Sequence, residues 1–193
     1  MLVENMDLQD YELREENMEL GRAVRFSYLV TLAAAVLYTA VYLLRYSYYN
    51  IFATVFKPTF LLEFFILMLF AFLFMAAGLI AKAAILAHAC ENSWQGVKFK
   101  IVRGLEKPYC AAVEPLTVRQ YMLGIAAYIL IAALVPYIIA FFVGDYIFVL
   151  ASFISVVWVS GDIILLLKLS KKNRGDYIVD IDCVMYYKIY GKK

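Results

Sequence analysis

The sequence predicts an all-α membrane protein with four transmembrane helices and a small cytoplasmic-side β-hairpin between the second and third helices. Three observations support this fold class. Hydrophobic residues make up 65% of the chain and its mean hydropathy is +0.76, whereas soluble domains are about 45–50% apolar. Four apolar stretches are each long enough to cross a bilayer, for which a helix needs about 20 residues. Lys and Arg cluster between these stretches, and a net charge of only +2 does not indicate a nucleic-acid partner.

The first 25 residues form an acidic segment that contains the sequence ENMDLQDYELREENMEL. This segment lacks the basic start and the small-residue cleavage site of a signal peptide. Its apolar residues Leu2, Met6, Leu13 and Leu20 recur at loosely helical spacing. We therefore expect a short amphipathic or frayed helix in residues 1–25.

The transmembrane domain is predicted to cover residues 26–169. Its spans are expected at about 26–44, 59–81, 121–143 and 146–167. Each span must be a helix, because lipid offers no partners for exposed backbone groups. The second helix is expected to continue to about residue 92, since the alanine-rich sequence from Lys82 to Cys90 contains no helix breaker. Gly144 and Asp145 leave only a tight joint, which predicts that the third and fourth helices are antiparallel neighbours.

The distribution of Lys and Arg predicts the orientation in the membrane. One side receives most of these residues: Arg14, Arg22, Arg25, Lys98, Lys100, Arg103, Lys107, Arg119, Lys168, Lys171, Lys172 and Arg174. The other side receives Arg45 and Lys57. Because cytoplasmic loops carry the excess of positive residues, we expect a multi-pass protein of the cell membrane. Both termini, the loop after the second helix and a short tail of residues 170–193 are then cytoplasmic.

The loop between the second and third helices predicts the β-hairpin. In VKFKIV the apolar and basic residues alternate, RGLEKP supplies turn residues, and YCAAV can return as the second strand. Two interpretations of this hairpin stay open. It is either an amphipathic connector at the lipid headgroups, or an exposed edge that pairs with an extended peptide. The candidate partner-binding residues are Lys98, Phe99, Lys100 and Ile101. The tail sequence DYIVDIDCVMYYKIY, rich in β-branched and aromatic residues, predicts one or two further short strands.

Two ionisable residues are predicted at similar depth near the cytoplasmic end of the helices. Asp162 lies in WVSGDIILLLKL, where a charge costs about 2.5–3.5 kcal/mol on insertion scales and marks a functional candidate. It is alternatively protonated, or paired with Lys82. His88, the only histidine of the chain, lies in AKAAILAHACENSW. His88 and Asp162 are the candidate metal ligands, although a catalytic zinc normally has three protein ligands.

Several stretches together resemble a known family. They are VKFKI, KPYCAAVEPLTVRQYMLG, AALVPYIIAFFVGD, SGDIILLLKL and DYIVDIDCVMYYKIY. From about residue 86 to 190 the chain resembles the zincin peptidases, bacterial four-span membrane proteins grouped as a domain of unknown function and distantly similar to site-two intramembrane metalloproteases. The resemblance implies an H-E-x-x-H motif on the second helix, whose two His bind zinc while the Glu polarises a water. An Asp of the fourth helix then looks like the third ligand.

This motif is degenerate in the present chain. In the best register His88 is the second His and Asp162 is the Asp, but Ala84 and Ile85 occupy the positions of the first His and the Glu. The other register, HACEN, places Ala89 and Asn92 at the Glu and the second His. A missing general base alone typically removes about 10²–10⁴-fold of the rate. The resemblance therefore implies a pseudo-peptidase without catalytic residues.

The function predicted from the sequence is non-catalytic binding or regulation of a membrane peptide or membrane protein, with no cofactor. One alternative is an active zinc metallopeptidase that uses Zn²⁺ and an atypical site of His88, Asp162 and either Glu91 or Cys90. Another is a small transport or assembly subunit in which Asp162 carries a proton or pairs with a partner's cation. A bundle of four helices is also compatible with a homodimer in the bilayer.

Overall fold

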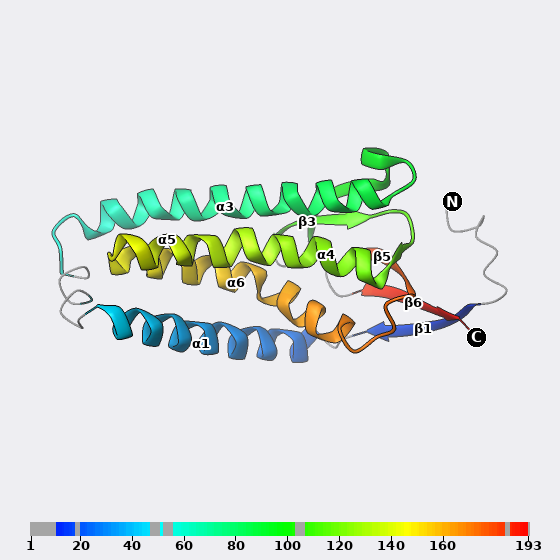
Figure 1. Ribbon diagram of the computed structural model, residues 1–193, viewed down its shortest axis with the longest axis horizontal. Helices are drawn as coiled ribbons and strands as arrows, with labels where there is room; N and C mark the ends of the chain where they lie inside the picture. Colours follow the sequence, from blue (N-terminus) through cyan, green and yellow to red (C-terminus); the bar gives the residue numbers. More distant parts are fainter. Residues whose placement is uncertain are drawn as a thin grey trace.

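The computed structural model describes residues 11–17, 20–46, 51, 56–102, 107–183 and 186–192. In this part of the chain, four helices are long and apolar enough to cross a membrane: Arg25–Arg45, Phe60–Ala89, Val118–Val143 and Tyr146–Leu169. They lie side by side as a bundle (Figure 1), which confirms the four predicted helices of a multi-pass membrane protein. They correspond to α1 (Leu20–Arg45), α3 (Phe60–Ala89), the composite third span and α6 (Tyr146–Leu169).

The second span, α3, is one uninterrupted helix of 30 residues, as predicted, and it ends at the cap residue Cys90. At 1.5 Å per residue it is about 45 Å long, more than the hydrocarbon core of about 30 Å. It packs against the third span and α6, while α1 packs against α6. Close approach to the third span requires Gly78, because a Cβ there would lie 2.9 Å from the Tyr128 ring.

The third span consists of α4 (Val118–Ile129), the π-helical segment η4 (Leu130–Leu134) and α5 (Val135–Val143). Its start is fixed by a capping box between Thr117 and Gln120. The π segment lies just before Pro136, which has no N–H and whose ring clashes with a carbonyl four residues back. The Val135 N–H instead bonds to the Leu130 carbonyl, five residues back. The wider π turn accommodates the ring and the missing N–H of Pro136, so the helix continues past the proline.

The joint between α5 and α6 is as tight as the sequence predicts. Gly144 has a φ of +79°, in the left-handed region, and caps α5. The Asp145 side chain caps α6 by accepting a hydrogen bond from the Ile147 N–H at 3.2 Å. The two helices therefore run antiparallel and in contact.

The described strands all lie at one end of the bundle, which we call the sheet end (Figure 1, right). The predicted hairpin is confirmed as β2 (Val97–Val102) paired antiparallel with β3 (Lys107–Ala112); its turn, residues 103–106, lies outside the described residues. A second, antiparallel sheet has the order β1-β6-β5-β4. Its strands are β1 (Tyr11–Asn17), β4 (Leu116–Thr117), β5 (Tyr177–Cys183) and β6 (Tyr186–Lys192).

The prediction of a short N-terminal helix is wrong for the described part of residues 1–25. Residues Tyr11–Asn17 form strand β1, and α1 already begins at Leu20. The physical reason is tertiary pairing: β1 stands in register with β6, from Tyr11 opposite Lys192 to Asn17 opposite Tyr186. A ladder of backbone hydrogen bonds outweighs the weak helical periodicity of this segment. Residues 1–10 lie outside the described residues. The fold is therefore mostly helical. Strands β5 and β6 confirm the strands predicted for the tail, whereas β1 and β4 were not predicted.

Candidate functional site

A buried ion pair joins α3 to α6 near the sheet end. The Nζ atom of Lys82 lies 3.2 Å from Oδ1 of Asp162, and the two residues are only 1% and 2% exposed. Lys82 belongs to the buried face of α3, together with Leu79 and Leu86. Of the alternatives that the sequence left open for Asp162, pairing with Lys82 is the one that the structure contains.

Three tyrosine rings surround the ammonium group of Lys82. Their centroids lie 5.1, 5.8 and 6.0 Å from Nζ, for Tyr109, Tyr121 and Tyr128 respectively. These distances allow cation–π attraction, which adds to the stability of a cation removed from water. The hydroxyl groups of Tyr109 and Tyr121 are also 3.5 Å apart. Because Tyr109 lies on β3, this cluster links the hairpin to the core of the helix bundle.

The structure does not bring His88 together with Asp162. His88 lies six residues after Lys82 on α3, which rotates it by about 240° around the helix and moves it about 9 Å along the axis. Its side chain is exposed, whereas Asp162 is buried against Lys82. Ala84, one turn before His88, is exposed on the same side. The face of α3 that carries Ala84 and His88 is thus not the face that packs against α6.

Cys90 and Glu91, the other two residues considered as metal ligands, are also poorly placed for this role. The Cys90 thiol is buried, and its Sγ lies 3.7 Å from the Gly96 carbonyl to which it donates. Burial, with a smaller effect of the Glu114 carboxylate, raises the pKa of the Cys90 thiol to about 11. It therefore remains protonated at neutral pH, whereas the thiolate is the form that binds metal. The Glu91 side chain is exposed to the surroundings.

Glu114 is a structural residue that the sequence analysis missed. Its carboxylate is 8% exposed and accepts hydrogen bonds from the backbone N–H of Glu91 at 2.7 Å and of Asn92 at 3.3 Å. The side-chain amide of Asn92 donates a third, at 2.6 Å. Glu114 thereby holds the end of α3 against the connection from β3 to α4. Its sequence signal, a Glu before Pro115, does not reveal partners more than 20 residues upstream.

Across the described residues, no group of three His, Cys, Asp or Glu side chains is arranged so that it can hold a metal ion. The candidate ligand His88 lacks an acidic, thiol or imidazole neighbour one turn back, since that position is Ala84. The carboxylate of Asp162 is already neutralised by an ammonium. The residues present at these positions therefore do not fit the zinc site that the resemblance implies.

The candidate partner-binding residues lie on β2, the outer strand of the hairpin. Among the described strands, β2 is hydrogen-bonded to β3 only, so no strand forms a ladder with its second edge. Phe99 and Ile101 are 59% and 71% exposed; Lys98 is exposed and Lys100 is half-buried. In contrast, Tyr109 and the next three residues of β3 are buried. The hairpin thus packs through β3 and presents β2 outward.

Comparisons with known proteins found no match to this chain. No protein-family model matches the chain, and neither a curated protein nor a solved structure matches it significantly. The geometry therefore defines a four-helix membrane protein with an exposed edge strand and a buried ion pair, and the resemblance to zincin peptidases stays a prediction.

Proposed function

We propose that this protein is a non-catalytic membrane protein that binds an extended segment of a membrane protein or peptide along the edge of β2. It lies in the cell membrane with its termini and its hairpin in the cytoplasm. The observation that carries the proposal is the position of β2, an outer strand whose apolar residues Phe99 and Ile101 are largely exposed.

An edge strand binds an extended segment through its backbone. Its outward N–H and C=O groups offer the ladder that a further strand completes, and alternate side chains on the edge provide selectivity. On β2 these side chains are of two kinds, the apolar Phe99 and Ile101 and the basic Lys98 and Lys100. A segment in which apolar and acidic residues alternate complements both kinds.

The lack of catalysis is supported by what replaces the zinc ligands. Ala84 and Ile85 carry no atom that can hold a metal or activate a water. His88 faces away from Asp162, whose charge is compensated by Lys82. The same pairing favours a binding protein over a subunit that needs a partner's cation for Asp162, because the compensating cation belongs to this chain.

The cytoplasmic placement of the sheet end is supported by its charge. Exposed cations there include Lys98, Arg119, Lys171 and Arg174, whereas Arg45 and Lys57 are the described cations at the opposite end. This asymmetry follows the positive-inside rule. A partner segment near the cytoplasmic face of the membrane would meet β2 directly.

The test begins with a photo-crosslinking amino acid, benzoylphenylalanine, at position 99 in native membranes. A matched control places it at Trp94, which is 57% exposed but lies outside the strand, in the short helix η3 (Ser93–Gly96). We expect one defined protein to be crosslinked from position 99 and not from position 94. A synthetic peptide of the crosslinked segment must then bind the purified protein and slow hydrogen exchange of β2 amides. A peptide that binds without protecting β2 contradicts the proposal.

A metal analysis tests the non-catalytic part separately. Protein purified without chelator is expected to contain no stoichiometric zinc, and His88→Ala is expected to change nothing in the metal content. Stoichiometric zinc that disappears on His88→Ala, together with zinc-dependent peptide cleavage, would restore the metallopeptidase alternative.

A further inference from the structure

Basic side chains gather where the fourth span ends, at the sheet end of the bundle. The segment from the last turn of α6 onward reads KLSKKNRGD, residues 168–176, with four cations and one carboxylate. Lys171 and Arg174 are exposed, and Lys168 is half-buried. Lys172 of the same segment has interactions of its own within the protein, so it is not counted with the other three.

A fourth cation, Arg119, joins this segment from the start of the third span. The Val118 N–H donates a hydrogen bond to the Asp176 carbonyl at 2.8 Å, and α4 packs against α6. Arg119 is the next residue after this contact, and its side chain is exposed. We call the following four residues the basic cluster: Arg119, Lys168, Lys171 and Arg174.

The charges of the basic cluster are not compensated within the protein. In the part of the chain that the structure describes, none of the four side chains forms an ion pair or a hydrogen bond. This differs from Lys57 at the opposite end of the bundle, whose ammonium is held by Asp145 and Glu63. Like charges three or four residues apart repel each other, so an external anion would stabilise the cluster.

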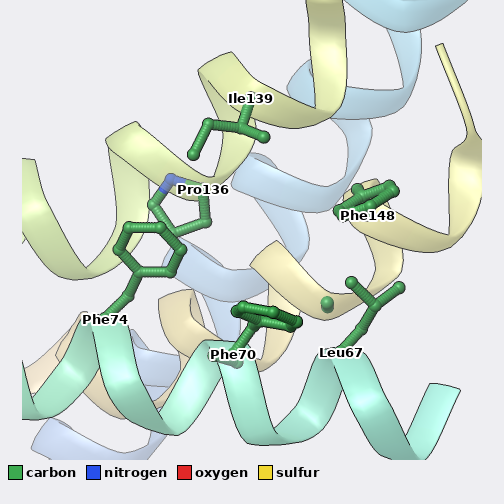
Figure 2. Close-up of a pocket in the computed structure, with 8 residues that line it drawn as sticks. Leu67, Phe70, Phe74, Pro136, Ile139 and Phe148 are labelled. Carbon is green, nitrogen blue, oxygen red and sulfur yellow. The ribbon is translucent and has the colours of Figure 1, made fainter. Parts of the chain in front are cut away.

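Between its two ends, the bundle presents apolar side chains. Figure 2 shows one such region, where Leu67, Phe70 and Phe74 of α3 face Pro136 and Ile139 of α5. An anion has no partner there, because its charge would lose water without compensation. The negative charge of a lipid is therefore met at the ends of the spans, where the headgroups lie.

The basic cluster lies at the depth of these headgroups. The tight joint between α5 and α6 places the other ends of both spans at nearly the same depth. A hydrocarbon core of about 30 Å takes about 20 residues of helix, which reach from this joint to about residue 124 in the third span and about residue 165 in α6. Arg119 and Lys168 lie about three to five residues further, or about 4–8 Å, and each headgroup layer is about 5–8 Å thick.

The cluster is also aligned with side chains that face away from the bundle. Arg119 lies one helical turn before Leu123, which is 55% exposed. Lys171 follows Leu167, which is 57% exposed, by four residues through a continued turn, since its N–H bonds to the Lys168 carbonyl at 3.2 Å. A basic side chain can lie along such apolar surface and place its charge among the headgroups. Exposed leucines beside the cations favour a lipid over a soluble acidic partner.

We propose that the basic cluster binds the headgroups of anionic phospholipids, with its cations paired to their phosphates. This site depends on the four membrane spans and not on the partner-binding edge of β2. Each cation near an anionic membrane surface strengthens binding about fivefold. The bound headgroups hold the start of α4 and the segment before β5 at the membrane surface, and with them the sheet that contains β5.

The experiment uses the full chain in nanodiscs with equal amounts of phosphatidylglycerol, which is anionic, and phosphatidylcholine, which is zwitterionic. Trp94 and Trp158 are replaced by Phe, and Leu167→Trp places the only tryptophan beside the cluster. Fluorescence quenching is compared between discs that carry brominated acyl chains on one lipid and discs that carry them on the other. The ratio of the two binding constants is expected to favour phosphatidylglycerol about fivefold.

The matched control places the tryptophan at the opposite end, as Leu61→Trp. Leu61 is 68% exposed, and the nearby Lys57 is already held by two carboxylates. We expect a ratio near one at this position. An equal preference for phosphatidylglycerol at both positions would mean attraction by the protein as a whole and would overturn the site.

Charge variants test the cluster itself. Lys171→Gln with Arg174→Gln is expected to lower the preference at Leu167→Trp below about twofold, whereas Lys171→Arg with Arg174→Lys keeps both charges and should leave it unchanged. Salt raised from about 0.1 to 1 M shortens the screening length from about 10 to 3 Å and should act like the Gln variants. Circular dichroism checks that each variant is folded. A preference that survives the Gln variants, or no preference in the unaltered cluster, would overturn the proposal.

Discussion

Lys82 and Asp162, which are 80 residues apart in the sequence, face each other across α3 and α6 with their charged atoms 3.2 Å apart. Each side chain would be unfavourable alone in an apolar bundle, since an unpaired buried charge costs several kcal/mol. As a pair they neutralise each other, and three tyrosine rings enclose the ammonium. The pair thus explains how two ionisable residues are accommodated in otherwise apolar helices.

The first prediction concerns the removal of one partner of this pair. Lys82→Met leaves the Asp162 carboxylate buried without its cation. We expect the free energy of unfolding to fall by about 3–5 kcal/mol, the usual loss when a buried pair is broken from one side. Denaturant unfolding in detergent micelles, followed by circular dichroism, measures this change.

The control is the double variant Lys82→Met with Asp162→Leu, which replaces both charges by apolar groups of similar size. It should regain most of the lost stability, because no uncompensated charge remains. If the double variant loses as much free energy of unfolding as Lys82→Met and Asp162→Leu lose together when measured separately, the two residues do not act as a pair.

The second prediction concerns the joint between α5 and α6. Gly144 has a φ of +79°, and a Cβ added there would lie 2.9 Å from the Tyr46 ring. Gly144→Ala is expected to lower the melting temperature, since a left-handed backbone conformation costs a non-glycine residue about 1–2 kcal/mol. Gly175→Ala is the control, because a Cβ there would meet nothing within 4 Å. Equal melting temperatures of the two variants would contradict this explanation.

The helical framework could be predicted from local sequence because a bilayer imposes length and apolarity on each span. Phe60–Ala89 and Tyr146–Leu169 satisfy both conditions without reference to the rest of the chain. The π segment was not predicted, although Pro136 indicates some irregularity. A proline can kink a helix, widen it or end it, and the choice depends on how neighbouring helices pack.

The other missed features depend on contacts distant in sequence. Strand β1 forms because β6, at the other end of the chain, stands beside it. Glu114 finds its partners at the end of α3. The ion pair was only one of several alternatives for Asp162, since helical periodicity does not show which face of α3 meets α6. Once the buried face of α3 is known to contain Lys82, the exposure of His88 follows from the helix geometry.

The third prediction concerns the carboxylate that holds the end of α3. Glu114→Ala removes the acceptor for the N–H groups of Glu91 and Asn92 and for the Asn92 side chain. We expect a loss of at least about 1.5–3 kcal/mol, the value of one hydrogen bond to a charged group. Hydrogen exchange should also become faster in the last turn of α3. The exposed Glu91→Ala is the control and should change stability by less than about 0.5 kcal/mol. Equal effects of the two variants would show that the carboxylate of Glu114 does not hold this turn.

The last prediction concerns two buried thiols, Cys110 in the hairpin and Cys90 at the end of α3. Burial raises the pKa of Cys110, like that of Cys90, from an ordinary value of 9.0 to about 11. A pKa that rises from 9.0 to about 11 lowers the thiolate fraction at neutral pH about a hundredfold, and the thiolate is the reactive form. In a Cys183→Ser background, alkylation by iodoacetamide should therefore be slow at neutral pH and should accelerate as the pH approaches 11.

The exposed reference thiol for the alkylation is Ser170→Cys. The same rise in the pKa of Cys90 and Cys110 also determines how the stability of the protein depends on pH. Because the folded protein keeps these protons to higher pH than the unfolded chain, their contribution to stability is complete below the ordinary value of 9.0 and is lost as the pH rises toward about 11. Replacing Cys90 and Cys110 by Ala should flatten this alkaline loss in denaturant titrations. Alkylation of Cys90 or Cys110 as rapid as that of the Ser170→Cys thiol at neutral pH would show that neither thiol is protected by burial.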